Sequence, residues 1–176
     1  MIQHVNVKIF AGWHEGVDPA AAIPVFQRWI QEDVCPELMI DVADYRHVPA
    51  GPGVILVGHE ANYSLDYGRG RLGLLYNRKV ASGSPGKEQV AQALSAALAA
   101  CRRLEAEPEF EGRLKFQDGE LEITFNDRAL APNTEEEFRA VRPAIAAALE
   151  AVYGPGERRL ERRGEARERL RVGVRL

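Results

Sequence analysis

Four short strand-like segments separated by tight-turn sequences constrain the fold of this chain more than any other feature. They cover residues 38–48, 54–58, 62–67 and 71–77. The links PAGPG and GRG contain glycine and proline, which form tight turns, and links this short join antiparallel neighbours. The sequence therefore predicts an antiparallel meander of four strands.

One strand is predicted before the meander, and one helix on each side of it. Apolar and polar residues alternate over residues 5–10, which is typical of a strand. Apolar residues at helical spacing predict a helix over residues 24–33. A second helix is predicted to begin at Ser84-Pro85, with Ser84 as its N-cap and Pro85 in its first turn.

The second half of the chain has the pattern of two strands, a helix and two further strands. Asp118-Gly119 is typical of a two-residue hairpin turn, which would place Phe116 opposite Leu121. Both are apolar and would share one face of the hairpin. Residues 169–176 alternate arginine with apolar residues and predict a final, half-buried strand.

The third predicted helix has recognisable signals at both ends. Thr134 and Glu137 have the spacing of a capping box, which marks a helix start. Gly154 is well placed to end the helix. Pro143 lies between these ends and should kink the helix, because an interior proline costs about 3 kcal/mol.

These elements predict an α+β fold with a mostly antiparallel sheet and three main helices. The expected order is strand, helix, four-strand meander, helix, then ββαββ. At 176 residues the chain suits one domain over residues 1–176. The acidic stretch EAEPEFEG at residues 105–112 could divide it into two lobes, 1–104 and 113–176, that share one sheet or core.

Composition excludes several classes of protein. A net charge of −3 argues against a protein that mainly coats nucleic acid. No apolar run approaches the ~18 residues expected of a membrane span. Cys35 and Cys101 lie far apart and form no C-x-x-C, so we expect buried free thiols and a reducing cytoplasm.

The glycines at positions 68, 70 and 73 match G-x-G-x-x-G, but their context does not fit a dinucleotide-binding loop. That loop must be followed by a helix, whereas LLYNRK after Gly73 is strand-like. A hairpin turn at Gly68-Arg69 explains the pattern better. It would place Asp66 opposite Arg71 as a cross-strand ion pair.

Two His-Glu pairs are the candidate catalytic residues. His14-Glu15 and His59-Glu60 each follow the end of a predicted strand. If those strands are parallel, the pairs meet at one sheet edge, where they could bind a divalent metal or perform acid–base chemistry. A structural role is the alternative, with Glu60 as a salt-bridge partner of Arg78.

The C-terminal segment is rich in arginine. Residues 157–176 contain eight arginines and four glutamates. Phosphate backbones or an acidic partner could bind such a strand. No aromatic residue is interleaved with the arginines, and Glu120 and Glu122 offer partners within the chain. The pattern therefore favours a salt-bridged sheet face or a subunit interface over nucleic-acid binding.

The function predicted from these features is association. Residues 54–57 are apolar at every position, so that strand needs cover on both faces, which a second copy of the chain could supply. We expect a soluble cytoplasmic protein without a cofactor that acts through self-association, as a homo-oligomer, or through an acidic protein partner at the arginine-rich strand. The alternative is a small metal-assisted or acid–base enzyme, hydrolase-like, centred on the two His-Glu pairs. A weaker alternative is anion binding near residues 84–87.

Overall fold

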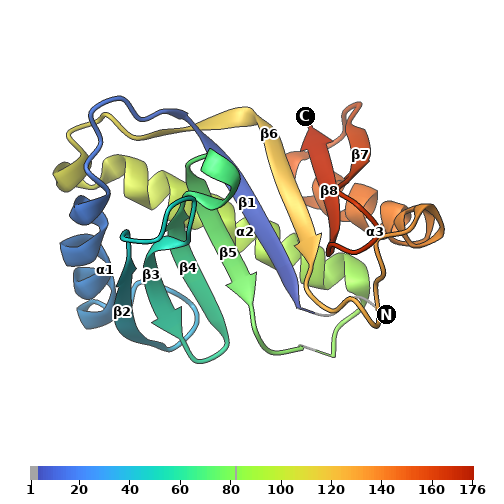
Figure 1. Cartoon of the computed structure of the whole chain (residues 1–176), viewed down its shortest axis with the longest axis horizontal. Helices are drawn as coiled ribbons and strands as arrows, with labels where there is room; N and C mark the ends of the chain where they lie inside the picture. Colours follow the sequence, from blue (N-terminus) through green and yellow to red (C-terminus); the bar gives the residue numbers. More distant parts are fainter. Residues whose placement is uncertain (1–3, 82) are drawn as a thin grey trace.

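Eight strands form one antiparallel sheet in the computed structural model, which describes residues 4–81 and 83–176. Their order across the sheet is β2-β3-β4-β5-β1-β6-β8-β7 (Figure 1). The strands are β1 (Val5–Trp13), β2 (Met39–Tyr45), β3 (Gly53–Gly58), β4 (Ala61–Asp66), β5 (Gly73–Arg78), β6 (Lys115–Phe125), β7 (Arg159–Arg163) and β8 (Leu170–Arg175). The main helices are α1 (Ala22–Gln31), α2 (Gly86–Ala106) and α3 (Glu135–Tyr153). The predicted α+β class is confirmed.

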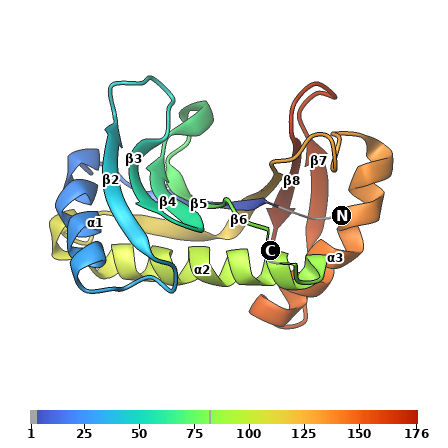
Figure 2. The same ribbon diagram turned by 90° about the horizontal axis from the view of Figure 1, so that it is seen from below.

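All three helices lie on the same side of the sheet. Figure 2 shows α2 beneath the middle of the sheet, α1 outside β2 and α3 outside β7. Both ends of the sheet bend away from α2, so the opposite face is concave. Among the described residues this face carries no α-helix, only the short 3₁₀ turn at Gly68–Gly70. Strand β1 from the first half pairs with β6 from the second, so one sheet includes strands from both halves of the chain.

The predicted four-strand meander is present as β2 to β5, but the turn between β4 and β5 is longer than predicted. Asp66 lies opposite Gly73 rather than opposite Arg71, and a short 3₁₀ turn spans Gly68–Gly70. The Asp66 carboxylate accepts a hydrogen bond from the Gly68 N–H at 2.9 Å, which stabilises this wider turn. The predicted two-residue turn and the Asp66–Arg71 ion pair are therefore wrong.

The predicted hairpin at Asp118-Gly119 is also wrong. Both residues lie within β6, a single strand of 11 residues. Its long neighbour β1 pairs with residues on both sides of the dipeptide, with an irregularity between Ile9 and Ala11 that accommodates the extra residues. This neighbour supplies hydrogen-bond partners that a hairpin would otherwise supply, so the chain continues in one direction and the second half is βαββ.

The helix ends follow the sequence signals closely for α3 and less closely for α2. Thr134 is the N-cap of α3 and its hydroxyl accepts a hydrogen bond from the Glu137 N–H at 3.2 Å, while Gly154, with φ of 80°, ends the helix. Pro143 lies inside α3. The N-cap of α2 is Pro85 rather than the predicted Ser84.

The apolar core lies between the sheet and the helices. In β3, Val54 and Leu56 are fully buried on the helix side, whereas Ile55 and Val57 are half-buried on the open face. Cover is therefore complete on one face of this strand and partial on the other. No helix among the described residues is long and apolar enough to cross a membrane.

Candidate functional site

The two predicted His-Glu pairs lie at opposite ends of the strands. The ladders β1–β5, β5–β4 and β4–β3 are all antiparallel, so β1 and β3 run in opposite directions (Figure 1). His14-Glu15 follows the end of β1, and His59-Glu60 lies between β3 and β4 at the other end. The parallel arrangement on which the predicted catalytic centre depended is absent, so these residues do not converge.

The surroundings of the second pair match the structural alternative. Glu60 forms an ion pair with Arg78 at 3.2 Å, and the His59 N–H donates to the Leu38 carbonyl at 2.8 Å. Among the described residues, no group of three histidine, cysteine, aspartate or glutamate side chains is arranged to hold a metal ion.

A different set of polar residues converges on the open face of the sheet. The strand pairing aligns six polar side chains in one row across six strands. The row consists of Asn62, Asn77, Asn6, Thr124, Arg171 and Arg163. A neighbouring row contains Ser64, Leu75, Lys8 and Glu122. Because side chains alternate between faces along each strand, the helix side of the same strands remains apolar.

Lys8 and Asp66 form a buried ion pair in this face. Their side chains are 2.5 Å apart, and the two residues are only 4% and 6% exposed. The Lys8 ammonium also donates to the Gly68 carbonyl at 3.1 Å. Burial lowers the pKa of Lys8 because it penalises the ammonium ion, while the nearby Asp66 carboxylate opposes this shift. The pair therefore places two buried, paired charges at a fixed position in the centre of the open face.

Glu122 is a second buried carboxylate beside this pair. It is 4% exposed and is surrounded by the guanidinium groups of Arg69, Arg163 at 3.8 Å and Arg171 at 3.5 Å. Arg163 also pairs with Glu120 at 2.9 Å. The predicted salt-bridged face, with Glu120 and Glu122 as partners of the C-terminal arginines, is confirmed.

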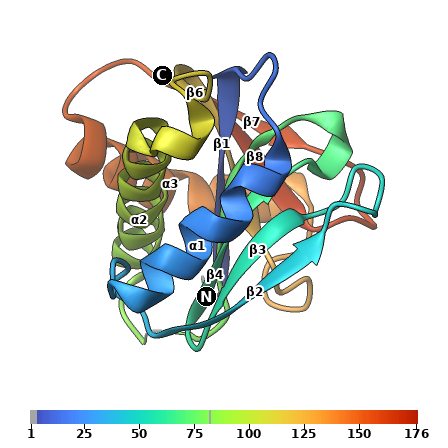
Figure 3. The ribbon, with the colours of Figure 1, turned by 90° about the vertical axis from the view of Figure 1, so that its left-hand side faces the viewer.

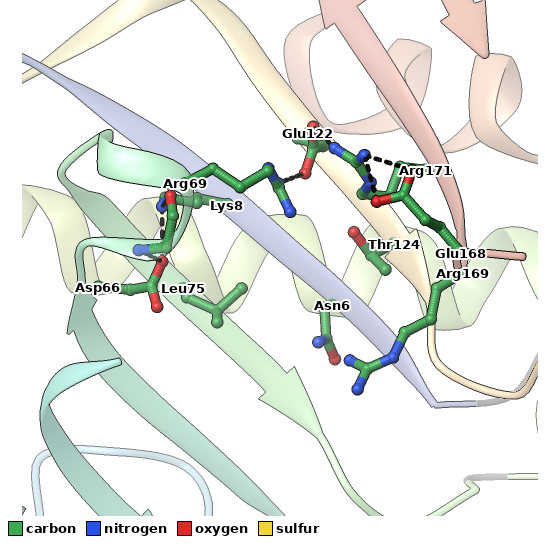
Figure 4. Close-up of a pocket in the computed structure, with 11 residues that line it drawn as sticks. Asn6, Lys8, Asp66, Arg69, Leu75, Glu122, Thr124, Glu168, Arg169 and Arg171 are labelled. Carbon is green, nitrogen blue, oxygen red and sulfur yellow. Dashed lines mark hydrogen bonds and ion pairs between the residues drawn. The ribbon is translucent and has the colours of Figure 1, made fainter. Parts of the chain in front are cut away.

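Arg69 reaches across the face from the turn between β4 and β5. Its backbone is in the left-handed region, with φ of 58° and ψ of 28°, which is uncommon for a residue other than glycine. Figure 4 shows its side chain extending from this turn toward Glu122 on β6. Strained backbone at such a position is typical of sites where a side chain must be held in one direction.

These residues surround a cleft of about 300 Å³ in the open face. Its lining comes from five strands and from two loops, one between β4 and β5 and one preceding β8 (Figure 4). The lining residues are Asn6, Lys8, Asp66, Gly68, Arg69, Leu75, Glu122, Thr124, Glu168, Arg169 and Arg171. The cleft can offer hydrogen-bond donors and positive charge to a ligand.

A larger and more apolar cavity, of about 700 Å³, lies between α2 and the end of α1 with the loop that follows it. Figure 3 shows α1 running obliquely to α2. Behind it, the buried Glu37 carboxylate accepts hydrogen bonds from the Tyr63 hydroxyl at 2.8 Å and the Tyr76 hydroxyl at 2.7 Å. Burial raises the pKa of Tyr76 to about 12 and that of Cys35 to about 12, so both groups keep their protons near neutral pH. Cys35 is a free thiol, as predicted, but it is half-buried rather than buried, whereas Cys101 is free and buried.

Sequence reasoning missed most of the open-face cluster. Lys8 carries a visible signal, because a lysine in the middle of VNVKIF is surrounded by residues that a central strand buries. Its partner Asp66 is 58 positions away and had been assigned to Arg71. Comparison with protein-family models, curated proteins and solved structures finds no significant match to this chain.

Proposed function

We propose that this protein acts by binding a partner protein, which presents acidic side chains to the open face of the sheet. One observation carries the proposal: among the described residues, this face has no α-helix over it and holds more cationic than anionic side chains, in a chain whose net charge is −3. The cations are Lys8, Arg69, Arg71, Arg159, Arg163, Arg169, Arg171 and Arg175. The anions are Asp41, Asp66, Glu120, Glu122, Glu161 and Glu168. Complementary charge favours encounter with an acidic surface.

A protein partner fits this face better than a nucleic acid. Buried carboxylates alternate with the arginines, and they would repel a continuous phosphate backbone. Among the described residues that line the cleft, none is aromatic, so bases have no stacking platform there. On β3, Ile55 and Val57 are half-buried on the same face and would add apolar contact area, as protein interfaces require.

The proposal can be tested with defined probes. A fluorescent decaglutamate peptide, a decalysine peptide and a single-stranded oligothymidylate would be titrated with the protein, and anisotropy measured at rising salt. We expect binding of decaglutamate alone, weakened by salt. Arg69→Ser/Arg71→Ser should weaken it at least tenfold, since two charge-assisted contacts are lost.

The matched control is Arg102→Ser/Arg142→Ser, which removes two exposed arginines from α2 and α3 on the helix side. It changes the net charge by the same amount. Equal weakening by both double variants would reduce the effect to net charge and contradict a site on the open face. Binding of oligothymidylate in preference to decaglutamate would replace the acidic protein with a nucleic acid.

Self-association is a second candidate, supported by the β2 edge of the sheet. Half of the exposed large hydrophobic side chains among the described residues lie at or near β2: Leu38 at 68%, Ile40 at 58%, Tyr45 at 44% and Val48 at 40% exposure. An antiparallel pairing of β2 with β2 of a second copy would cover these side chains. It would also give hydrogen-bond partners to the backbone N–H and C=O groups on the outer edge of β2. Sedimentation velocity should show that Leu38→Ser/Ile40→Ser loses any dimer that the native chain forms. A native chain that stays monomeric at high micromolar concentration would exclude this candidate.

We infer that this function belongs in the reducing cytoplasm. The support is that Cys35 and Cys101 are both free thiols in the folded chain. Disulfides are favoured in oxidising compartments, and a free thiol is more stable where glutathione keeps it reduced. Cell fractionation, followed by labelling of the thiols after rapid denaturation, would test this location. Recovery of the chain from an oxidising fraction would contradict it.

A further inference from the structure

Three of the four cations that line the open-face cleft already have carboxylate partners within the chain. The pairs are Lys8 with Asp66, Arg69 with Glu122, and Arg171 with Glu122 and Glu168. The fourth cation is Arg169. No carboxylate in the described part of the chain pairs with it, so the cleft is one negative charge short of balance.

Arg169 is exposed, but it has contacts within the chain at both ends. Its carbonyl oxygen accepts a hydrogen bond from the amide of Asn133, a residue only 1% exposed, at 3.2 Å. A β-bridge to Pro132 fixes the same stretch of backbone. At the other end, Nη1 of the guanidinium donates to Oδ1 of Asn126 at 2.9 Å. An arginine carries five N–H donors, so most of those on Arg169 remain available to a ligand.

The orientation of Asn126 is itself determined by its neighbours. Its Nδ2 group donates to Oδ1 of Asn6 at 2.7 Å and to Oδ1 of Asn77 at 3.3 Å. A flipped amide would lose both bonds and turn an N–H toward the guanidinium, so Oδ1 must face Arg169. Figure 4 shows Arg169 reaching toward Asn6 at the end of the cleft, with Thr124 nearby. The arginine is preorganised, which lowers the entropy lost on binding.

We propose that this cleft binds one carboxylate group, with Arg169 as its main partner and the Thr124 hydroxyl as a further donor. The inference rests on the proposed function, since it names the group that the acidic partner inserts. An aspartate or glutamate side chain and a C-terminal carboxylate share this chemistry. A single negative charge balances the cleft, whereas a doubly charged phosphate would face repulsion from Glu122 and Glu168, which line the same space. The planar guanidinium matches a carboxylate with two parallel hydrogen bonds.

The test is an NMR titration of the full chain with small probes. Ac-Ala-Glu-Ala-NH2 presents only a side-chain carboxylate, Ac-Ala-Ala-Ala-OH presents only a terminal one, and Ac-Ala-Gln-Ala-NH2 presents neither. Inorganic phosphate is the fourth probe. We expect one or both carboxylate peptides to shift the Arg169 Nε–H signal and the amides of residues 124–126, and the glutamine peptide to shift neither. The difference between the first two peptides identifies the source of the carboxylate.

Three variants distinguish a specific carboxylate site from general attraction. Arg169→Gln should weaken the carboxylate peptides about tenfold to hundredfold, the range for hydrogen bonds to a charged group. Arg169→Lys keeps the charge but loses the paired geometry, so it should bind with intermediate affinity. Asn126→Asp places a carboxylate against Arg169 from within the chain and should abolish binding while Arg169 remains in place.

Arg167→Gln is the matched control, because Arg167 lies in the same loop, is 83% exposed and is paired with Glu165. It should bind like the native chain. Equal weakening by Arg167→Gln and Arg169→Gln, or unchanged affinity in Arg169→Gln, would overturn the inference. So would preferential binding of phosphate. If decaglutamate still binds the open face while the small carboxylates do not, this inference fails and the proposed function stands; if no acidic probe binds, the proposed function fails as well.

Discussion

The two faces of the sheet are both buried at the central strand, but they are buried by different interactions. On β1, Val7 and Ile9 point toward the helices and are covered by apolar packing. Lys8, between them, points to the open face, yet it is only 4% exposed because the β4–β5 turn and its ion pair with Asp66 enclose it. Adjacent residues of one strand are therefore excluded from water by the hydrophobic effect on one side and by salt bridges on the other.

This difference has an energetic consequence. Burying apolar area is favourable in itself, at roughly 25 cal/mol per Å². A buried ion pair loses its hydration and recovers little net free energy, although it imposes one geometry on its surroundings. We therefore expect the helix side to supply most of the folding stability, and the open face to supply a rigid arrangement of charges suited to binding.

The largest stability effect should come from breaking the buried pair on one side only. Asp66→Asn leaves the Lys8 ammonium buried without a counter-ion, which should cost about 3–5 kcal/mol of unfolding free energy. Lys8→Met/Asp66→Asn removes both charges and keeps an acceptor for the Gly68 N–H, so it should lie within about 1 kcal/mol of the native chain. Urea unfolding of Asp66→Asn, Lys8→Met and the double variant gives the coupling free energy between Lys8 and Asp66. Additive losses in the double variant would contradict the comparison between the faces.

The pH dependence of Asp66→Asn provides an independent readout. The pKa of Lys8 is lowered by burial, and Asp66 opposes that shift, so removing Asp66 should lower the pKa further. The folded protein then loses the Lys8 proton at a pH where the unfolded chain still holds it. Asp66→Asn should therefore regain stability as pH rises from about 7 toward about 10, whereas Lys8→Met/Asp66→Asn should not. Thermal unfolding across this range measures the difference.

The apolar face should respond differently, because truncating a side chain there leaves a cavity rather than an unpaired charge. Leu121 is 1% exposed and lies between Ile9 and Val174 on the neighbouring strands. Leu121→Ala should cost about 3 kcal/mol through lost burial and the cavity that remains. Chemical denaturation measures it, and the exposed Leu130→Ala serves as a control with an expected loss below about 0.5 kcal/mol. A similar loss in both variants would mean that the helix side is not the principal core.

Local signals were sufficient to predict most of the elements and the order of the strands within the meander, but not the register of β5 against β4. The alternation before Phe10 predicted β1, and the Thr134 capping box predicted the start of α3. Such signals depend on residues within a few positions of one another. The Asp118-Gly119 hairpin failed because a distant strand, β1, supplied the hydrogen-bond partners that the local pattern assigned to a turn.

The candidate site could not be predicted in the same way, because its contacts depend on strand order. Lys8 meets Asp66 and lies beside Glu122 only because β1 is placed between β5 and β6. The same strand order separates His14 from His59, which sequence alone had allowed to converge. The arginines of the C-terminal segment were correctly assigned to Glu120 and Glu122, which pair with Arg163 of β7 and Arg171 of β8. This assignment needed only that the last strands lie on the same side of β6 and share its open face.

Arg69 allows the role of the open face in stability to be separated from its role in binding. Arg69→Gly relieves the left-handed backbone but loses a salt bridge whose arginine side chain is 54% exposed, so the net change should stay within about 1 kcal/mol. Arg69→Ala loses the same bridge and keeps the backbone strain, and should be less stable than Arg69→Gly by about 1 kcal/mol. Urea unfolding gives this order, and both variants should bind decaglutamate more weakly than the native chain. Arg69→Gly being the less stable variant would show that the strain is not significant.

The smallest effect should appear at the acid end of the pH range. Hydrogen bonds from Arg71, and then from Arg163, lower the pKa of Glu120 below its ordinary value of 4.5. A carboxylate with a lowered pKa stabilises the folded state above that ordinary value, and its contribution is lost as pH falls through the lowered one. Glu120→Gln lacks this contribution at every pH, so its melting temperature should fall less steeply than that of the native chain between about pH 5 and about pH 3. Glu150→Gln, an exposed carboxylate on α3, is the control and should follow the native curve. Identical curves for native chain and Glu120→Gln would mean that these ion pairs hold geometry alone and add nothing to stability, which would widen the contrast between the two faces.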